Sequence, residues 1–327
     1  MLGDMDTGTI VSSSPITLRE FMDRWMEVAN TKVRERTFDQ YRWITENYIC
    51  KTLGAYKLRE IQAYQVQRFY TELLNRNLSP RTVRYTHYVL SSALNQAVTW
   101  RLITHNPCAE CDLPKQPRME MKYFTPEEVA RFLETARTSK WYPLFLLAIE
   151  TGMRPEEYFG LQWKDINFEE KTVTVRRALV WRKGGGFVFT EPKTSRSRRC
   201  IPISATLLQS LKMHRRAQLE VRIKLGAAYQ DHDLVFASEI GTGLMNRNIN
   251  RRHFRPLMKL AGLPQIRLYD LRHTTATMLL LLGENPKVVS ERLGHASVTL
   301  TLDTYSHVLP TMQKTATEKL EKMMFGT

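Results

Sequence analysis

Five side chains between residues 154 and 305 are of the types that transfer a phosphoryl group without a metal ion: Arg154, Lys193, Arg272, His295 and Tyr305. Two guanidinium groups can clamp non-bridging phosphate oxygens and balance the charge that grows in the transition state. A lysine can protonate a leaving oxygen, and a tyrosine can attack phosphorus and store the bond energy as a phosphotyrosine ester. Because that ester is re-used for rejoining, such chemistry needs no ATP.

Both arginines lie at predicted helix ends. Arg154 follows Gly152, which we expect to end a buried helix, "WYPLFLLAIETG", and Glu157 three residues later is spaced to form a fixing ion pair. Arg272 is expected in the first turn of an apolar helix capped by Asp270, where a cation opposes the helix dipole unless an anion binds. Arg272 therefore suggests a bound phosphate, whereas Arg154 taken alone is better explained as a surface arginine.

Two further side chains have an alternative explanation. Lys193 is expected at the tip of a hairpin in "TEPKTSRSRRCIPI". Such a tip can reach into a DNA groove, but a lone lysine there is by default a solubilising residue. His273, beside Arg272, could be a second donor to phosphate or a structural cap partner.

His295 and Tyr305 lie in "LGHASVTLTLDTYSHV". Gly294 is expected to end a helix that begins with Asn285 as cap and Pro286 at the first position, so His295 directly follows a helix end. The apolar residues and threonines after it alternate as in a strand. Taken alone, Tyr305 would be a core aromatic, but the four side chains upstream make it the candidate nucleophile.

The composition indicates a folded, basic protein. The chain has 327 residues, of which 43% are hydrophobic, and a formal net charge of +15. This length can bury one or two cores and favours two domains. A folded chain this basic most often meets a polyanion, and nucleic acid is the first candidate. Ribosomal or membrane-surface binding stays open.

Several other classes of site are disfavoured. The isolated Cys108-x-x-Cys111 pair offers too few ligands for a zinc knuckle, and only four cysteines fit a reducing cytoplasm. We find no P-loop, no H-E-x-x-H and no acidic cluster typical of a two-metal nuclease, so we expect neither a metal nor a cofactor. No apolar run reaches the roughly 18 residues that span a bilayer. The first 16 residues read as a flexible leader, not a signal peptide.

The periodicity of the chain predicts two domains of different kinds. From Thr17 to Thr104 it is helical and predicts a bundle of four helices, the last starting at Ser79 and Pro80. The prolines that follow argue against regular structure and indicate a linker. The expected organisation is a leader at 1–16, a helical domain at 17–105, a linker at 106–122 and a second domain at 123–327.

The second domain is expected to mix helices with a small sheet. Thr125, Pro126 and Glu128 give strong helix-start signals through a capping box. The stretches "KTVTVRRALVW", "GFVFTEP" and "RRCIPI" predict three short strands in consecutive hairpins, with Gly184–Gly186 in the first turn. From Ser204 onward the chain is again expected to be helical.

In order and spacing, four motifs resemble the tyrosine recombinase, or phage integrase, family: "TGMRPEEYFGLQW", "EPKTSRSRRCIPI", "LYDLRHTTATMLLLLG" and "LGHASVTLTLDTYSHV". "LSPRTVRYTHYVLSSALNQAVTWRLITHNP" resembles the family's core-binding domain. The resemblance implies a mainly α fold with a small antiparallel β-sheet, arranged as a two-domain DNA clamp of a helical SAM-like core-binding domain and a mixed α/β catalytic domain. It also implies short helices, in place of a strand, around Tyr305.

The implied function is site-specific recombination of duplex DNA through a 3′-phosphotyrosine intermediate and a Holliday junction, for integration or excision of a mobile element. By resemblance Arg154 and Arg272 are the clamp arginines, Lys193 the hairpin lysine, His295 the third-box histidine and Tyr305 the nucleophile. Glu157 matches a structural acidic position. One departure is Tyr269, which stands where the family usually has a histidine. A phenol can donate a hydrogen bond to phosphate but is a poor base at neutral pH.

The resemblance also implies partners. Double-stranded attachment sites would bind a homotetramer, and a DNA-bending or directionality factor could assist. The C-terminal helical tail would dock on a neighbouring protomer, and the enzyme would be cytoplasmic, encoded by a bacterium or phage and associated with the nucleoid. The expected DNA contacts are Lys32, Arg34, Arg36, Thr37, Arg81, Thr82, Arg84, His87, Thr194, Arg196 and Arg198.

Two other functions stay open from the residues. A relaxing enzyme similar to type IB topoisomerases would use the same chemistry without exchanging partners. A non-catalytic DNA-binding regulator could keep the fold, but the presence of the tyrosine and both arginines disfavours it.

Overall fold

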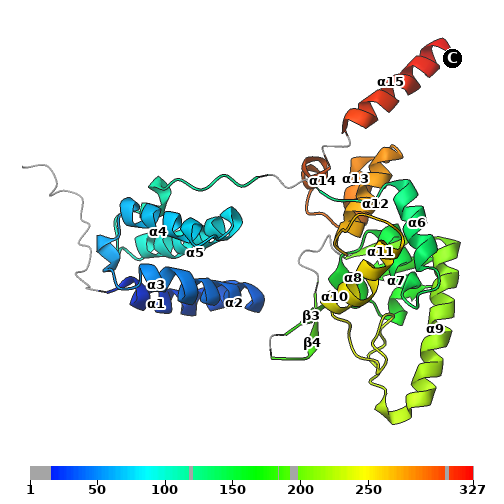
Figure 1. The fold of residues 1–327 in the computed structure, drawn as a ribbon, viewed down its shortest axis with the longest axis horizontal. Helices are drawn as coiled ribbons and strands as arrows, with labels where there is room; N and C mark the ends of the chain where they lie inside the picture. The colour runs from blue at the N-terminus through cyan, green and yellow to red at the C-terminus, as the bar shows by residue number, and fades with distance from the viewer. Residues whose placement is uncertain (1–15, 118–120, 183, 192–197, 306–308, 327) are drawn as a thin grey trace, which may run out of the picture. The chain divides into compact units, whose positions relative to one another are not determined.

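A computed structural model describes residues 16–117, 121–182, 184–191, 198–305 and 309–326 (Figure 1). The chain divides into two compact units, Met1–Met119 and Glu120–Thr327, and both are mainly helical. Lys193, Thr194 and Arg196 lie outside the described residues, as does the expected leader.

The first unit is a bundle of helices around an aromatic-rich core that includes Phe21, Trp25 and Phe69. Thr17 opens α1 with a capping box. Ser79 caps α5, as the sequence predicts. The elements are α1 (Leu18–Lys32), α2 (Glu35–Ile44), η1 (Thr45–Ile49), α3 (Cys50–Thr52), η2 (Leu58–Glu60), α4 (Ala63–Asn75), α5 (Pro80–Thr99) and η3 (Pro107–Glu110).

The short helix η3 corrects the expectation that the proline-bearing segment has no regular structure. The side chain of Asn106 accepts a hydrogen bond from the backbone N–H of Cys108 at 3.0 Å. Pro107 occupies the first helical position, where its missing N–H breaks no hydrogen bond. Cys108 is buried in the core, so this turn closes the first unit against α4 and α5.

The second unit packs its helices around a buried apolar helix, α7, which contacts α6, α9 and α12. The Thr125 capping box opens α6, as predicted. Figure 1 shows α9 as one long helix along the outside of this unit. The helices are α6 (Pro126–Ala136), α7 (Tyr142–Thr151), α8 (Pro155–Phe159), η4 (Trp163–Asp165), α9 (Ala205–Leu225), η6 (Gly226–Ala228), α10 (Asn246–Ile249), η7 (Asn250–Phe254), α11 (Arg255–Leu260), α12 (Asp270–Leu281), α13 (Pro286–Leu293), α14 (Val298–Thr304) and α15 (Leu309–Phe325).

The expectation of three short strands in consecutive hairpins is confirmed for the first hairpin and wrong for the second. The first expected strand divides at Arg176 and Arg177, and Arg177 leaves the sheet to form an ion pair with the buried carboxylate of Asp165. The strands are β1 (Ile166–Asn167), β2 (Thr172–Val175), β3 (Ala178–Trp181), β4 (Phe187–Thr190) and β5 (Arg199–Pro202). β5 pairs with β2 in an antiparallel sheet of order β1-β2-β5, whereas β3 and β4 form a separate hairpin that turns, as predicted, at its glycines.

Two local predictions near the C-terminus are also wrong. Asp270 does not cap α12, because Tyr269 holds that position and the Asp270 carboxylate instead accepts hydrogen bonds from Arg267. The alternating segment after Ser297 is helix α14, as the resemblance implies, and not a strand. The hydroxyl of Ser297 caps it by accepting from the backbone N–H of Leu300.

Gly152, which ends α7, offers a test of how tightly this unit is packed. Its φ is +64°, and a Cβ there would lie 2.6 Å from Cδ2 of Leu293. Gly262 has φ +63° with nothing within 4 Å of the same Cβ, so it is a matched control. We expect Gly262→Ala to lower the free energy of unfolding by about 1–2 kcal/mol. Gly152→Ala should lower the free energy of unfolding by about 1–3 kcal/mol more, because the added Cβ overpacks the core.

The measurement is denaturant unfolding of both variants beside the parent chain. Equal losses would contradict the packing seen around Gly152.

Candidate active site

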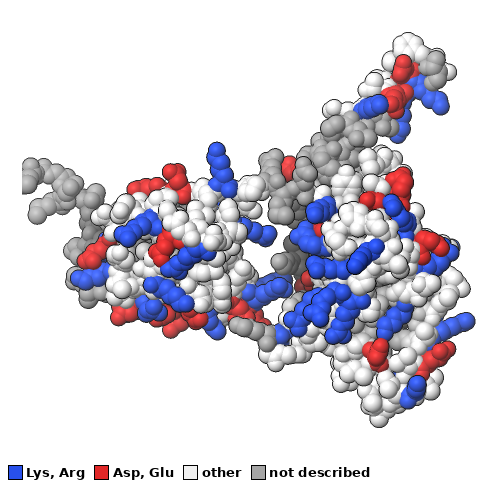
Figure 2. All heavy atoms as spheres, viewed as in Figure 1, with Lys and Arg blue, Asp and Glu red and all other residues white. Residues whose placement is uncertain are grey.

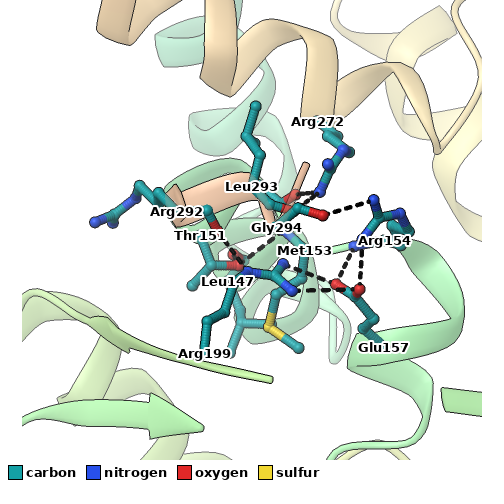
Figure 3. Close-up of polar contacts among 11 residues, drawn as sticks. Leu147, Thr151, Met153, Arg154, Glu157, Arg199, Arg272, Arg292, Leu293 and Gly294 are labelled. Atoms are coloured by element: carbon teal, nitrogen blue, oxygen red, sulfur yellow. Dashed lines mark hydrogen bonds and ion pairs between the residues drawn. The ribbon is translucent and has the colours of Figure 1, made fainter. Parts of the chain in front are cut away.

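The centre of the site is the guanidinium of Arg272, in the first turn of α12, which is only 2% exposed. Its Nη1 donates to the carbonyl oxygens of Gly152 at 2.9 Å and Leu293 at 2.7 Å (Figure 3). Its Nη2 is buried and has no hydrogen-bond partner among the described residues. Burial, followed by repulsion from Arg154, lowers the pKa of Arg272 to about 10, so the group stays charged at neutral pH. A buried cation with an unused donor is suited to an anion.

Two helix ends supply the carbonyls that hold this cation. Gly152 ends α7 and Gly294 ends α13, both in the left-handed conformation that glycine adopts without strain. The last carbonyls of a helix lack intrahelical partners and carry partial negative charge. They therefore attract Arg272 without neutralising it.

Glu157, on α8, ties a second and a third guanidinium to the site, and it is 5% exposed. It accepts from Nη1 of Arg154 at 2.8 Å and from Nη2 of Arg199 at 2.8 Å. The ion pair expected between Arg154 and Glu157 is thus confirmed. Burial raises the pKa of Glu157, but Arg199 and Arg154 outweigh that effect, and the pKa lies below its usual value.

Arg154 reaches from this pair to the centre of the site. Its Nη2 donates to the carbonyl oxygen of Gly294 at 3.1 Å, one residue beyond the carbonyl that holds Arg272. The side chain is 30% exposed, so it remains accessible to a ligand. Two arginines far apart in sequence therefore meet at the end of α13, as Figure 3 shows.

His295 follows Gly294 and is held in the neutral form. Its Nδ1 lies 2.7 Å from the hydroxyl of Thr301 on α14. Burial first, then the charges of Arg272 and Arg154, lower the pKa of His295 to about 3. A neutral imidazole whose Nδ1 accepts from Thr301 carries its proton on Nε2, where it can donate to a ligand.

Tyr305 follows α14 and is 1% exposed, within a small apolar cluster that includes Leu280, Val289 and Leu293. Its hydroxyl lies 3.0 Å from Nδ1 of His273. Burial raises the pKa of this phenol above its ordinary value, although Arg272 acts in the opposite direction. Tyr305 is therefore neutral here.

Tyr269 and Arg198 are the other expected site residues of the second unit that the structure describes. Tyr269 is 38% exposed, and its ring meets that of His273 edge-on, with centroids 5.5 Å apart. Arg198 is exposed and pairs with Glu191 at the end of β4.

The expected contact residues of the first unit lie near the end of α1, the start of α2 and the first half of α5. His87 is 2.8 Å from the hydroxyl of Tyr70, and burial lowers its pKa. Arg84 donates to the carbonyl of Pro114 at 3.1 Å, and Lys32 to the side chain of Gln96 at 3.3 Å. Their contact with DNA stays a prediction.

Sequence reasoning missed two features. Arg199 was one of several arginines after the hairpin, yet it shares the alternating face of β5 with the buried Ile201, a pattern that could have singled it out. The other is a run of exposed cations on α10, η7 and α11 that carries no acidic residue. Its members are Arg247, Arg251, Arg252, Arg255 and Lys259.

Within the described ranges, no group of three or more His, Cys, Asp or Glu side chains could hold a metal ion. Nor does any described helix combine the length and apolar character needed to cross a membrane.

Comparison with protein-family models gives two matches. Residues 122–312 match the phage integrase family, and residues 17–74 match the phage integrase N-terminal SAM-like domain. A tyrosine recombinase XerC-like protein of Caldanaerobacter subterraneus subsp. tengcongensis is 32% identical, over 98% of this chain and 87% of the relative. The ICEBs1 integrase of Bacillus subtilis is 29% identical, over 88% of this chain and 78% of the relative.

Solved structures show the same fold. The Tn1549 transposon integrase in complex with a circular intermediate DNA has a TM-score of 0.79 at 22% identity, covering 93% of this chain and 99% of that one. A lambda integrase dimer bound to a COC′ core site has a TM-score of 0.64 at 19% identity, covering 89% and 95%.

The Glu157 ion pairs predict a measurable loss of stability. Glu157→Gln removes the buried carboxylate that pairs with Arg199 and Arg154, so the free energy of unfolding at pH 7 should fall by about 3 kcal/mol. The folded-state pKa of Glu157 is lowered, so its contribution is present above its unfolded pKa and is lost as the pH falls through the folded value. The gap between wild type and variant, measured by denaturant unfolding, should narrow below about pH 4.5.

Glu156→Gln, at the more exposed neighbouring carboxylate, is the control and should change stability by less than about 0.5 kcal/mol. A Glu157→Gln loss as small as that of the control would contradict the structural role of the pair.

Proposed function

Because the chain belongs to the phage integrase family, whose members are DNA breaking and rejoining enzymes, we propose that it integrates or excises a mobile element at specific sites through a 3′-phosphotyrosine intermediate and a Holliday junction. The observation that carries this proposal is the buried guanidinium of Arg272, whose Nη2 has no hydrogen-bond partner among the described residues. Arg154 binds the carbonyl of Gly294, the residue at which the segment leading to Tyr305 begins.

In the proposed reaction, Arg154 and Arg272 hold the non-bridging oxygens of the scissile phosphate. The oxygen of Tyr305 attacks phosphorus, the bond to the 5′ oxygen breaks, and Lys193 protonates the leaving oxygen. His295, neutral and fixed by Thr301, donates from Nε2 to the phosphate. In rejoining, a 5′ hydroxyl attacks the phosphotyrosine and the same groups act in reverse.

We assign DNA contacts to both units. The expected residues of the first unit, with Thr194, Arg196 and Arg198 of the hairpin region, would hold phosphates and set the register, since most such contacts carry no sequence information. The cations of α10, η7 and α11 join them. Figure 2 shows Lys and Arg side chains gathered on the face of the second unit over which α10 and α11 run. Duplex DNA as partner is supported by the Tn1549 and lambda integrase structures, which contain DNA.

A homotetramer on two DNA sites would complete the exchange. The helix α15 leaves Leu320, Met323 and Phe325 exposed, and such an apolar end is suited to dock on a neighbouring protomer. A DNA-bending or directionality factor could act on the same assembly.

Loss of the Tyr305 hydroxyl should abolish covalent capture of DNA. Nicked suicide duplexes tiled across the DNA on either side of the gene should trap the parent chain as a covalent 3′ complex, and Tyr305→Phe should form none. The matched control is Tyr158→Phe, because Tyr158 is buried in the same unit with a hydroxyl that lacks a hydrogen-bond partner in the described structure.

If the parent chain forms no covalent complex on any tiled duplex, the alternative function as a non-catalytic DNA-binding regulator is favoured. Relaxation of plasmids that lack the captured site would favour the topoisomerase-like function.

The cationic run should set the salt dependence of DNA binding. The logarithm of the DNA-binding constant falls as the logarithm of the salt concentration rises, and each lost phosphate contact reduces the steepness of that slope by about one. Arg251→Gln with Arg255→Gln should therefore reduce the slope by about two, measured by fluorescence anisotropy on the captured duplex. The charge-matched control, Arg216→Gln with Lys224→Gln on α9, should leave it unchanged; equal slopes in both double variants would contradict a contact at α10–α11.

A further inference from the structure

The proposed reaction leaves the proton of Tyr305 without a destination. The hydroxyl is buried, and burial raises its pKa above the ordinary value of a phenol. The family position at which a histidine is usual carries Tyr269, and a neutral phenol is a poor base. A nearby group must take the proton as the bond to phosphorus forms.

Two histidines flank the ring of Tyr305, and only one is arranged to accept. The ring of His295 stacks on it with centroids 6.5 Å apart, but Nδ1 of His295 bonds to Thr301 and its pKa is about 3, so the neutral imidazole does not take up a second proton at neutral pH. The ring of His273 meets that of Tyr305 edge-on, with Nδ1 at 3.0 Å from the hydroxyl and ring centroids 5.8 Å apart.

The helix α12 fixes His273 in this place. His273 follows Arg272 directly. One turn of α12 therefore positions both the proposed phosphate ligand and the residue that faces Tyr305. Tyr269 lies four residues earlier on the same face, and its ring meets His273 edge-on at 65°. His273 is half-buried.

We propose that His273 is the catalytic base of this enzyme, taking the role that the usual histidine at position 269 would have, with Tyr269 as its positioning residue. The inference rests on the proposed function of Tyr305. During cleavage the O–H bond of Tyr305 breaks and the proton moves to Nδ1 of His273, while the oxygen bonds to phosphorus and the 5′ oxygen leaves with a proton from Lys193. During rejoining Nδ1 returns the proton to Tyr305.

A sulfur-substituted substrate separates this role from the others. A suicide duplex with sulfur in place of the bridging 5′ oxygen has a leaving group that needs no proton, so it should restore cleavage by Lys193→Ala. His273→Asn keeps an acceptor near the position of Nδ1 but cannot take a proton. It should slow covalent complex formation about 100-fold or more, equally on the oxygen and sulfur duplexes.

Three outcomes decide the question. A His273→Asn rate within threefold of the parent chain would overturn the proposal, because a hydrogen bond alone would then suffice. Rescue of His273→Asn by sulfur would also overturn it, since the residue would then act on the leaving group. Slowing on both duplexes, with thermal unfolding and DNA affinity unchanged, supports it; His273→Gln serves in the same way if the Asn variant does not fold.

Failure of the proposed function would look different. In that case the parent chain itself would form no adduct, or Tyr305→Phe would still form one, whatever the His273 variants do.

Discussion

A guanidinium buried on backbone carbonyls is the constraint on which the rest of the site depends. Arg272 sits against the carbonyls of Gly152 and Leu293, with no carboxylate bonded to it among the described residues. Because peptide carbonyls attract a cation without cancelling its charge, the cost of burying this group is only partly offset in the free protein. A phosphate would complete the balance, so the packing of α7, α12 and α13 prepares an anion site before any ligand arrives.

Charge around this centre is distributed unequally. Glu157 is shared between Arg154 and Arg199, so one carboxylate fixes two guanidiniums and leaves the cluster positive with Arg272 included. Burial and then the same positive field keep His295 neutral, and the field partly offsets the rise in the pKa of Tyr305. One electrostatic arrangement thus favours an anion, disfavours a charged His295 and eases ionisation of the Tyr305 hydroxyl, as the proposed reaction requires.

Those parts of the fold and the site whose sequence signal is local could be predicted from the sequence. The Thr125 capping box and the left-handed glycines at 152 and 294 depend on a few neighbouring residues, and they appear as expected. The pairing of β5 with β2 was not predictable in this way, because it depends on Arg177 leaving the strand to meet Asp165. The contact of His273 with Tyr305 joins residues 32 apart, and no local pattern encodes it.

The segment before Tyr305 shows how tertiary contacts override propensity. Its alternating residues favour a strand, yet Ser297 caps a helix and the buried Thr301 binds His295. The result brings the tyrosine against α12 in place of a sheet.

Mass spectrometry of the covalent DNA complex is the most direct test of Tyr305 as the nucleophile. After nuclease and trypsin digestion, cleavage following Arg292 and Lys314 gives a peptide in which Tyr305 is the only tyrosine. The proposed reaction predicts a nucleotide joined to that side chain through its 3′ phosphate. A 5′-linked nucleotide, or one attached to any other residue, would contradict it.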